Sequence, residues 1–222
     1  NVDMAGIIAV PYDDGQYSVH MNYAKAWNLI GLEDRAGGAP DGVPDGEFTD
    51  FGDMEFFTTM VKVDGIGDGI SDWLDNTTVF ASYAQSKTNP DAGNFMLGSG
   101  KSERGHSIWI GANAPCPISP DTAKIGIEWN KGSKFWRSMT YAEDTMAGSK
   151  IATRGQAWEI YRTQKLTKAL SFGLSYVRMD YDYTGSNGFF GDFGTPIDSN
   201  SAAAANAVKS AQNASAYLKY KF

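Results

Sequence analysis

The sequence lacks features on which several protein classes depend. Only one of its 222 residues is cysteine, and only two are histidine. Cys116, in the Pro-rich stretch APCPISP, has no partner for an internal disulfide and stands in no c-type haem motif, so an isolated thiol in a turn explains it. No stretch approaches the roughly 20 consecutive apolar residues of a transmembrane helix, which excludes a helical membrane protein.

Positive charge is also scarce. The chain has 19 Lys and Arg residues against 26 Asp and Glu residues, and its formal net charge is −7. Proteins that bind nucleic acid present a basic face to the phosphates. The acidic balance therefore excludes nucleic acid as the partner.

Alternation with a period of two takes the place of helical periodicity. In YSVHMNYAKAW (17–27), every second residue except Lys25 is apolar or aromatic, and AKIGIEW, ALSFGLSY and the terminal AYLKYKF repeat the pattern. This alternation is typical of β-strands with one apolar face. We expect nine strands, at residues 2–12, 16–29, 54–63, 73–87, 105–113, 122–130, 156–165, 169–184 and 213–222.

The connections between these strands alternate in length. Short connections with tight-turn residues fall at 13–15, 64–72, 114–121 and 166–168. Long connections rich in Gly, Asp, Asn, Ser and Pro fall near 30–53, 88–104, 131–155 and 185–212. The segment SAAAANAVKSAQNA in the last of them predicts a short helix. Because transmembrane β-barrels have short periplasmic turns and long extracellular loops, the sequence predicts an all-β, antiparallel, up-and-down barrel in a bacterial outer membrane.

The last strand fits this prediction. Leu218, Tyr220 and Phe222 occupy alternate positions, and Phe222 is the last residue. This arrangement resembles the closing-strand signal of bacterial outer-membrane proteins, which the barrel-assembly machinery recognises. We therefore expect that machinery as a partner during biogenesis and outer-membrane lipid as the surroundings. A soluble β protein is the alternative, although exposed apolar edges are usually avoided.

The strand count makes a further prediction. Single-chain bacterial barrels have even numbers of strands, whereas nine are expected here. If Phe222 is periplasmic, the alternation of connections puts Asn1 on the extracellular side. The simplest explanation is that residues 1–222 form the C-terminal portion of one barrel domain of roughly 16–18 strands. A closed barrel of eight or ten strands formed by these residues alone would contradict it.

Two stretches in the second half of the chain point to a family. YAEDTMAGSKIATRGQAWEIYRTQKLTKALSFGLSY together with MDYDYTGSNGFFGDFGTP resembles uncharacterised bacterial porin-like proteins, found mainly in epsilon- and deltaproteobacteria and about twice this length. YDYTGSNGFFG (181–191) is the most specific part, and WNKGSKFW (129–136) supports it. The resemblance implies an outer-membrane barrel whose N-terminal half is missing here. It implies no reaction and no cofactor.

Two motifs have ordinary explanations. GSGKS (98–102) is part of a nucleotide-binding pattern, but Phe95 stands where a P-loop requires Gly, and a strand rather than a helix follows. A flexible loop explains it. DGIGDGISD (64–72) lacks the spacing of a calcium-binding loop, and a tight turn explains its composition. We therefore expect no metal.

Catalytic constellations are also absent from the pattern. The only histidines are His20 in mid-strand and His106 at a strand start, and nothing in the sequence places a Ser or Asp beside either. The sequence therefore predicts a protein that is not an enzyme.

The first long connection carries a cluster of acidic residues. It could fold into the barrel as a cation-attracting constriction, although charge runs of this kind are more often simply solvated faces. The cluster consists of Glu33, Asp34, Asp41, Asp45, Glu47, Asp50 and Asp53.

We expect a channel for passive or weakly selective diffusion of small hydrophilic solutes or ions. The alternative is a structural or adhesion barrel, or a sleeve that holds a partner such as an electron carrier. Whether three copies associate, as in many porins, stays open. The pore-lining candidates are His20, Asn22, Lys124, Glu128, Glu159, Ser171, Ser175, Lys219 and Lys221.

Overall fold

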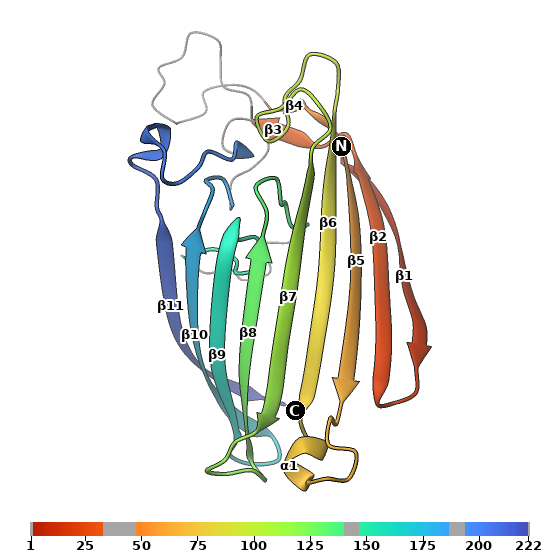
Figure 1. Ribbon diagram of the computed structural model, residues 1–222, viewed down its shortest axis with the longest axis vertical. Helices are drawn as coiled ribbons and strands as arrows, with labels where there is room; N and C mark the ends of the chain where they lie inside the picture. The colour runs from red at the N-terminus through yellow and green to blue at the C-terminus, as the bar shows by residue number, and fades with distance from the viewer. Residues whose placement is uncertain (1, 33–47, 140–146, 187–193, 222) are drawn as a thin grey trace.

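The computed structural model describes residues 2–32, 48–139, 147–186 and 194–221. Its main feature is a curved sheet of nine long strands with short turns at one end and long connections at the other (Figure 1). The strands are β1 (Asp3–Asp13), β2 (Tyr17–Trp27), β5 (Gly52–Asp64), β6 (Thr78–Pro90), β7 (Arg104–Pro115), β8 (Ala123–Gly132), β9 (Gly155–Lys165), β10 (Leu170–Tyr181) and β11 (Ser210–Tyr220).

Each long strand pairs antiparallel with the next long strand along the chain. The order is β1-β2-β5-β6-β7-β8-β9-β10-β11, which is an up-and-down meander. The predicted all-β class and the nine strands are therefore confirmed. Within the described residues the sheet does not close, because β1 and β11 each pair on one side only.

The differences from the expected elements are local. The strand expected from residue 73 begins at Thr78, because Ser71 caps a helical turn, α1 (Asp72–Asp75), by accepting a hydrogen bond from the Leu74 amide at 3.3 Å. The short helix expected within 201–214 is only the 3-10 turn η2 (Ala202–Ala204), since pairing with β10 extends β11 back to Ser210. A small hairpin of β3 (Ile30–Leu32) and β4 (Phe48–Asp50) was not expected.

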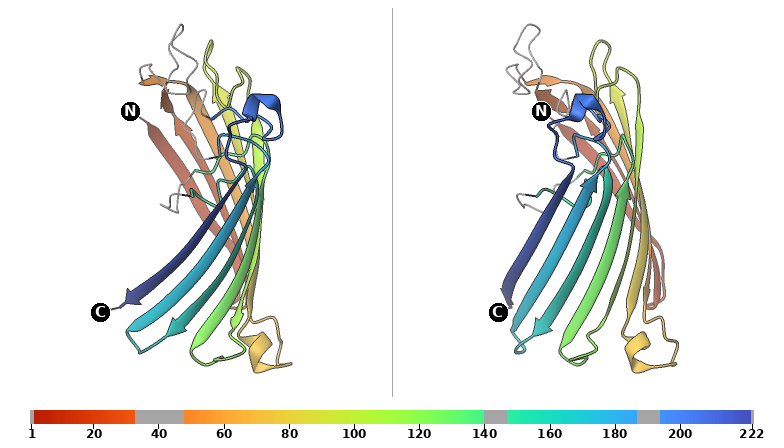
Figure 2. Two further views of the ribbon diagram at one scale, coloured as in Figure 1. Left: turned by 90° about the vertical axis from the view of Figure 1, so that its left-hand side faces the viewer. Right: turned by 60° about the vertical axis from the view of Figure 1, so that its left-hand side comes forward.

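The two faces of the sheet differ in chemistry. The apolar face carries the large side chains predicted by the alternation, and many are exposed, such as Ile110 at 43% and Ile160 at 59%. The polar face carries Ser, Thr, Asn and Glu side chains together with small residues. The sheet curves around the polar face, and the connection between β8 and β9 lies in this hollow (Figure 2). Such an apolar face fits a hydrocarbon environment better than water.

The apolar face ends in an ordered boundary toward the long connections. An aromatic residue closes it on every strand from β2 to β10 except β7, where Ile108 does so. We call these residues the boundary row: Tyr23, Phe57, Tyr83, Ile108, Trp129, Trp158 and Tyr176.

A second row lies two residues closer to the long connections on the same face. We call it the polar row, because every member is charged or polar. It consists of Lys25, Glu55, Gln85, His106, Lys131, Gln156, Arg178 and, on β11, Gln212. An aromatic boundary followed by polar residues is the outward pattern of membrane barrels.

The boundary row crosses the hydrogen-bonding register obliquely. Tyr23 of β2 is in register with His106 of β7, which lies two residues beyond the boundary residue Ile108. At β10 the boundary residue, Tyr176, lies about six residues from the position in register with Tyr23. The shift is about six residues, or roughly 20 Å, over about six strand spacings, or roughly 29 Å. If the boundary lies level in a bilayer, the strands tilt by about 35°, which is within the range of closed β-barrels.

Candidate functional site

The connection between β8 and β9 folds onto the polar face. We call its described residues, 133–139 and 147–154, the inward segment. Trp136 is 4% exposed, and its indole N–H donates to the Ile151 carbonyl at 2.8 Å, which joins the two halves of the segment. Gly105 and Gly132 leave room for it, since a Cβ on either would clash with the backbone of the segment.

Two buried arginines anchor the inward segment. Arg154 donates to the Trp136 carbonyl at 2.8 Å and to the Thr184 and Gly194 carbonyls at 3.0 and 2.6 Å. Arg137 donates its backbone N–H to the Ser86 hydroxyl of β6 at 3.1 Å. Burial, together with the charge of the neighbouring Arg137, lowers the pKa of Arg154 to about 9. Arg154 thus remains a cation at neutral pH and ties the segment to the connection after β10.

An ionic cluster lies where the inward segment meets the wall. Glu128 of β8 and Glu159 of β9 are opposite each other on the polar face, an arrangement that repels without a cation between them. The Lys150 ammonium donates to Glu128 Oε2 at 2.7 Å and to Glu159 Oε2. The side chains of Lys150, Glu128 and Glu159 are only 9%, 11% and 14% exposed, respectively. One cation faces two carboxylates, so the cluster has a formal charge of −1.

Neighbouring side chains complete the ionic cluster. The Trp109 indole N–H donates to Glu128 Oε2 at 3.0 Å, and the Ser175 hydroxyl donates to Glu159 Oε1 at 2.6 Å. The Lys150 ammonium lies 5.5 Å from the centre of the Trp109 ring, within cation–π range. Burial lowers the pKa of Lys150, but its bonds to Glu128 and Glu159 more than offset this, so the net shift is upward.

A cavity of about 470 Å³ separates the inward segment from the wall formed by β2 and β5–β8. His20 and Asn22, both predicted pore-lining residues, are among its lining residues, along with Ser107 and Asn130. Trp136 and Ile151 contribute to the opposite side. The cavity is therefore bounded by a polar wall and by a folded connection.

The predicted pore-lining residues divide into groups. Glu128, Glu159 and Ser175 meet in the ionic cluster, and His20 and Asn22 line the cavity. Three others lie on the polar face toward the short turns, away from the ionic cluster: Lys124, Ser171 and Lys219. The last, Lys221, directly follows β11 at the same end of the sheet. Lys124, Lys219 and Lys221 are exposed.

Two residues of the ionic cluster, Lys150 and Trp109, were not predicted. Lys150 lies in a connection whose path the strand pattern does not specify. The register places Glu128 and Glu159 opposite each other on adjacent strands, and two facing carboxylates indicate that a cation lies between them. Trp109 was marked only by its size among the small polar-face residues of β7, such as Ser107 and Gly111.

His20 has a serine beside it, contrary to the expectation from the sequence. Ser18 Oγ lies 3.1 Å from His20 Nε2, because residues two apart share a strand face. The statement that nothing places a Ser beside His20 is therefore wrong. Among the described residues, no carboxylate forms a hydrogen bond to His20, so the acid that orients the base in a catalytic triad is missing from this part of the chain.

The acidic cluster of the first long connection is described only in part. Glu33, Asp34, Asp41, Asp45 and Glu47 lie outside the described residues. Asp50 Oδ1 accepts the Gly52 amide at 3.0 Å. Asp53 forms an ion pair with Lys25 at 3.0 Å on the apolar side of the sheet, which is not a position inside the hollow.

Two other predicted features belong to exposed parts of the structure. Leu218 and Tyr220, predicted assembly-signal residues, are 68% and 63% exposed on the apolar face, and Phe222 lies outside the described residues. GSGKS lies in the connection between β6 and β7, with no helix after it.

The described residues contain neither a metal-binding cluster nor a helix that could span a membrane. These residues include no cluster of three or more His, Cys, Asp or Glu side chains arranged to hold a metal ion. They also include no helix with the length and apolarity needed to cross a bilayer.

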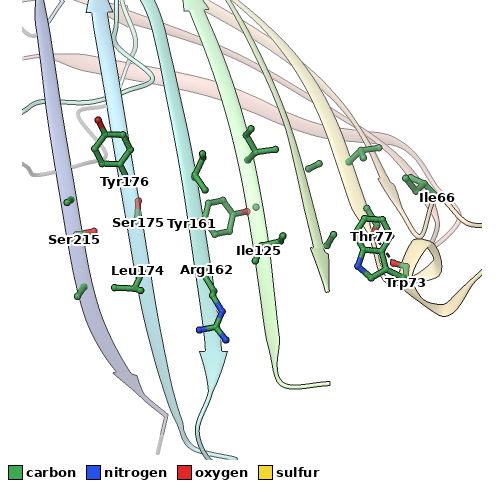
Figure 3. Close-up of a pocket in the computed structure, with 18 residues that line it drawn as sticks. Ile66, Trp73, Thr77, Ile125, Tyr161, Arg162, Leu174, Ser175, Tyr176 and Ser215 are labelled. Atoms are coloured by element: carbon green, nitrogen blue, oxygen red, sulfur yellow. Dashed lines mark hydrogen bonds between the residues drawn. The ribbon is translucent and has the colours of Figure 1, made fainter. Parts of the chain in front are cut away.

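The apolar face has a shallow groove of about 960 Å³ near the short turns (Figure 3). Trp73 and Ile66 from the connection between β5 and β6 lie at one side of it, and Leu174 and Arg162 lie toward the other. Small side chains form much of its floor, namely Ala112, Ala114, Ala214 and Ala216. Most of the lining side chains belong to the apolar face, opposite the ionic cluster, and Ser175 of β10 is the one member of the cluster among the residues that line the groove.

Similarity to solved structures supports the membrane-barrel architecture. Outer-membrane expressed OmpT of Vibrio cholerae is similar, with a TM-score of 0.55 and 12% identity. The in-vitro folded form, described as an outer membrane protein of Vibrio cholerae, gives a TM-score of 0.52 and 11% identity. In each case the similarity covers 99% of this chain and 56% of the other chain, so this chain spans little more than half of those barrels. At this identity the likeness shows the fold alone.

None of the curated proteins matches the sequence. A family model does: the one described as "Protein of unknown function (DUF3373)" matches residues 1–222. The chain therefore belongs to the DUF3373 family. The family description agrees with the predicted resemblance to uncharacterised proteins, while the predicted bacterial groups stay a prediction.

Proposed function

We propose that this member of the DUF3373 family forms part of the wall of an outer-membrane channel through which small hydrophilic solutes or ions diffuse. The observation that carries the proposal is the opposition of the two faces. An apolar face with an aromatic boundary lies on one side, and a polar hollow with the ionic cluster lies on the other. A wall of this kind places lipid outside and water inside.

The inward segment is the constriction in this proposal. It narrows the polar hollow where Lys150 joins Glu128 and Glu159, and the electric field of these largely buried charges acts on passing solutes. Because the formal charge of the cluster is −1, we expect a weak preference for cations at this level. Charged side chains that line a pore set ion selectivity in this way.

The complete channel requires more strands than the described sheet provides. The free edges of β1 and β11 expose backbone N–H and C=O groups, which are costly in hydrocarbon and are removed by barrel closure. We infer that further strands of a longer polypeptide pair with both edges. The coverage of 56% of the similar barrels supports this inference. In the full-length protein, the β1 amides that lack partners here should be protected from hydrogen exchange, and fast exchange there would contradict closure.

The function is tested by conductance of the full-length protein in a planar bilayer under a salt gradient. Stepwise ohmic currents with a reversal potential of cation-selective sign are expected. Lys150→Gln should change the current, whereas Lys101→Gln, in an exposed connection, should leave it unchanged. Folded and inserted protein without conductance would contradict the channel and favour the alternative, a sleeve or adhesion barrel.

Other partners stay predictions. Recognition of Leu218 and Tyr220 by the assembly machinery and association of three copies are not tested by the structure. The exposure of both side chains is compatible with recognition of the last strand before closure.

A further inference from the structure

The polar row on the apolar face has an uneven distribution of charge. Most of its charges are compensated within the sheet by neighbouring carboxylates. Lys25 pairs with Asp53 at 3.0 Å, and Arg178 pairs with Asp180 at 3.0 Å. Lys87, two residues beyond Gln85 on β6, pairs with Glu55 at 3.5 Å. These sectors therefore have little net charge.

The sector over β7 and β8 is different. Arg104, His106 and Lys131 lie there on the apolar face, and all three are exposed. Among the described residues, neither Arg104 nor Lys131 forms an ion pair. The residue opposite Arg104 on β6 is Lys87, which is already paired with Glu55, so it supplies no carboxylate to Arg104. We call Arg104, His106 and Lys131 the β7–β8 patch. Within the part of the chain that the structure describes, no carboxylate forms an ion pair with Arg104 or Lys131, so the patch is locally cationic in a chain with a net charge of −7.

The depth of the β7–β8 patch is fixed by aromatic neighbours. The His106 ring stacks on Tyr83 of the boundary row, with centroids 6.4 Å apart. Lys131 follows Trp129 of the same row by two residues and lies opposite Ile108. Since aromatic rings gather where hydrocarbon meets headgroups, Lys131 lies just beyond the hydrocarbon, at the level of headgroup phosphates. Arg104 is two residues beyond His106 on β7 and therefore lies farther out, on the side of the long connections.

The spacing indicates the size of the group that would fit. Arg104 and Lys131 are on adjacent strands and about four residues apart in register, so their Cα atoms are roughly 14 Å apart. Both side chains are long and flexible, and His106 lies between them. The arrangement suits a headgroup that both cations can reach at once, rather than a small ion held by a closed cage.

We propose that the β7–β8 patch binds a phosphorylated lipid headgroup in the leaflet on the side of the long connections. Arg104 and Lys131 contact phosphate oxygens through charge-assisted hydrogen bonds, and His106 adds a ring N–H. The boundary row beneath them, Ile108 and Trp129, packs against the acyl chains of the same lipid. The aliphatic stems of both cations extend along apolar surface toward the headgroup, as such side chains do at interfaces.

This inference rests on the part of the proposed function that places the barrel in a bilayer, and it does not depend on conduction. A protein that binds the lipid but passes no current would refute the channel alone. A protein that conducts but shows no lipid preference would refute the patch alone.

The experiment is native mass spectrometry of the full-length protein in nonionic detergent, with phosphatidic acid or phosphatidylcholine added at equal concentration. Phosphatidic acid exposes a phosphate monoester, and phosphatidylcholine masks its phosphate with a cation. We expect preferential retention of phosphatidic acid. Removing each cation should weaken binding about fivefold, and Arg104→Ser with Lys131→Ser about 25-fold.

The matched control removes a compensated pair from the same row. Arg178→Ser with Asp180→Ser should leave the preference unchanged, because that pair contributes no net charge. Equal loss in both double variants, or equal retention of the two lipids by the wild type, would overturn the proposal.

A variant that keeps both positive charges separates the effect of charge from an effect of misfolding in the serine variants. Arg104→Lys with Lys131→Arg should retain the preference, and salt near 0.5 M, where the Debye length is about 4 Å, should weaken it in the wild type. A wild-type preference that does not respond to salt would refute the electrostatic contact even if the serine variants failed to fold.

Discussion

The polar face carries charges in two places, and these differ in how they are held. Lys150, Glu128 and Glu159 are mostly buried beneath the inward segment and contact one another directly. Lys124 and Lys219 lie toward the short turns, are exposed, and belong to no ion pair among the described residues. The strand pattern supplies charged side chains to the polar face, and the folded connection between β8 and β9 buries some of them in the ionic cluster.

The largest effect should follow loss of the Lys150 charge. Lys150→Gln leaves Glu128 and Glu159 opposite each other without a cation, and a buried pair broken in this way costs about 3 kcal/mol. We expect lower stability in urea refolding, a larger conductance because the inward segment is released, and stronger cation selectivity. Unchanged current and stability would show that the ionic cluster does not hold the segment.

The opposite change should reverse the selectivity. Glu128→Gln with Glu159→Gln leaves Lys150 as the only charge in the cluster, so its formal charge becomes +1. At about 7 Å in water, one charge is worth roughly 0.6 kcal/mol. The charge of the cluster changes by two units, and the change acts in opposite directions on cations and anions, so the ratio of cation to anion permeability should fall by about tenfold or more. Reversal potentials under a salt gradient measure this ratio. A ratio that moves in the same direction as in Lys150→Gln would contradict the assignment.

The exposed lysines should matter less. Lys124→Gln and Lys219→Gln remove charges that are open to solvent, and such charges contribute about 0–1 kcal/mol. We expect unchanged stability and a small shift in reversal potential, smaller than for either change in the ionic cluster. Equal or larger shifts would move the constriction toward the short turns and reverse the comparison.

The smallest effect concerns pH. Since the pKa of Lys150 is raised from its ordinary value of 10.5, its contribution to stability is fully present below that value and is lost only as pH rises through the higher, folded-state pKa. Between about pH 6 and pH 9, Lys150 should therefore cause no change in conductance. Conductance and refolding measured across this range test the expectation, and a transition that disappears in Lys150→Gln would contradict it.

Much of the architecture was predictable because strand patterns are local. The alternation from Tyr17 to Trp27 and at the end of the chain specifies which residues share a face. The lengths of the connections specify which end of the barrel each belongs to. Errors arose where local signals competed. Ser71 capped a helical turn before β6, and pairing with β10 extended β11 into a segment whose alanines favour helix.

The candidate site was predictable in part. Glu128, Glu159 and Ser175 were identified by their positions on the polar face, and the structure brings them together. Lys150 and Arg154 could not be identified, because the path of a long connection depends on contacts that are distant in sequence. The Ser18–His20 contact could have been identified, since residues two apart on a strand always share a face.

The residue pattern alone specifies the number and order of the long strands, the apolar and polar faces, and the alternation of short and long connections. These features depend on a period of two residues and on turn chemistry, and both are local. The path of the connection between β8 and β9, and the charges that it brings together, depend instead on contacts between residues that are distant in sequence. The register places Glu128 opposite Glu159. Gly105 and Gly132 leave space for the inward segment, which brings Lys150 to the two carboxylates.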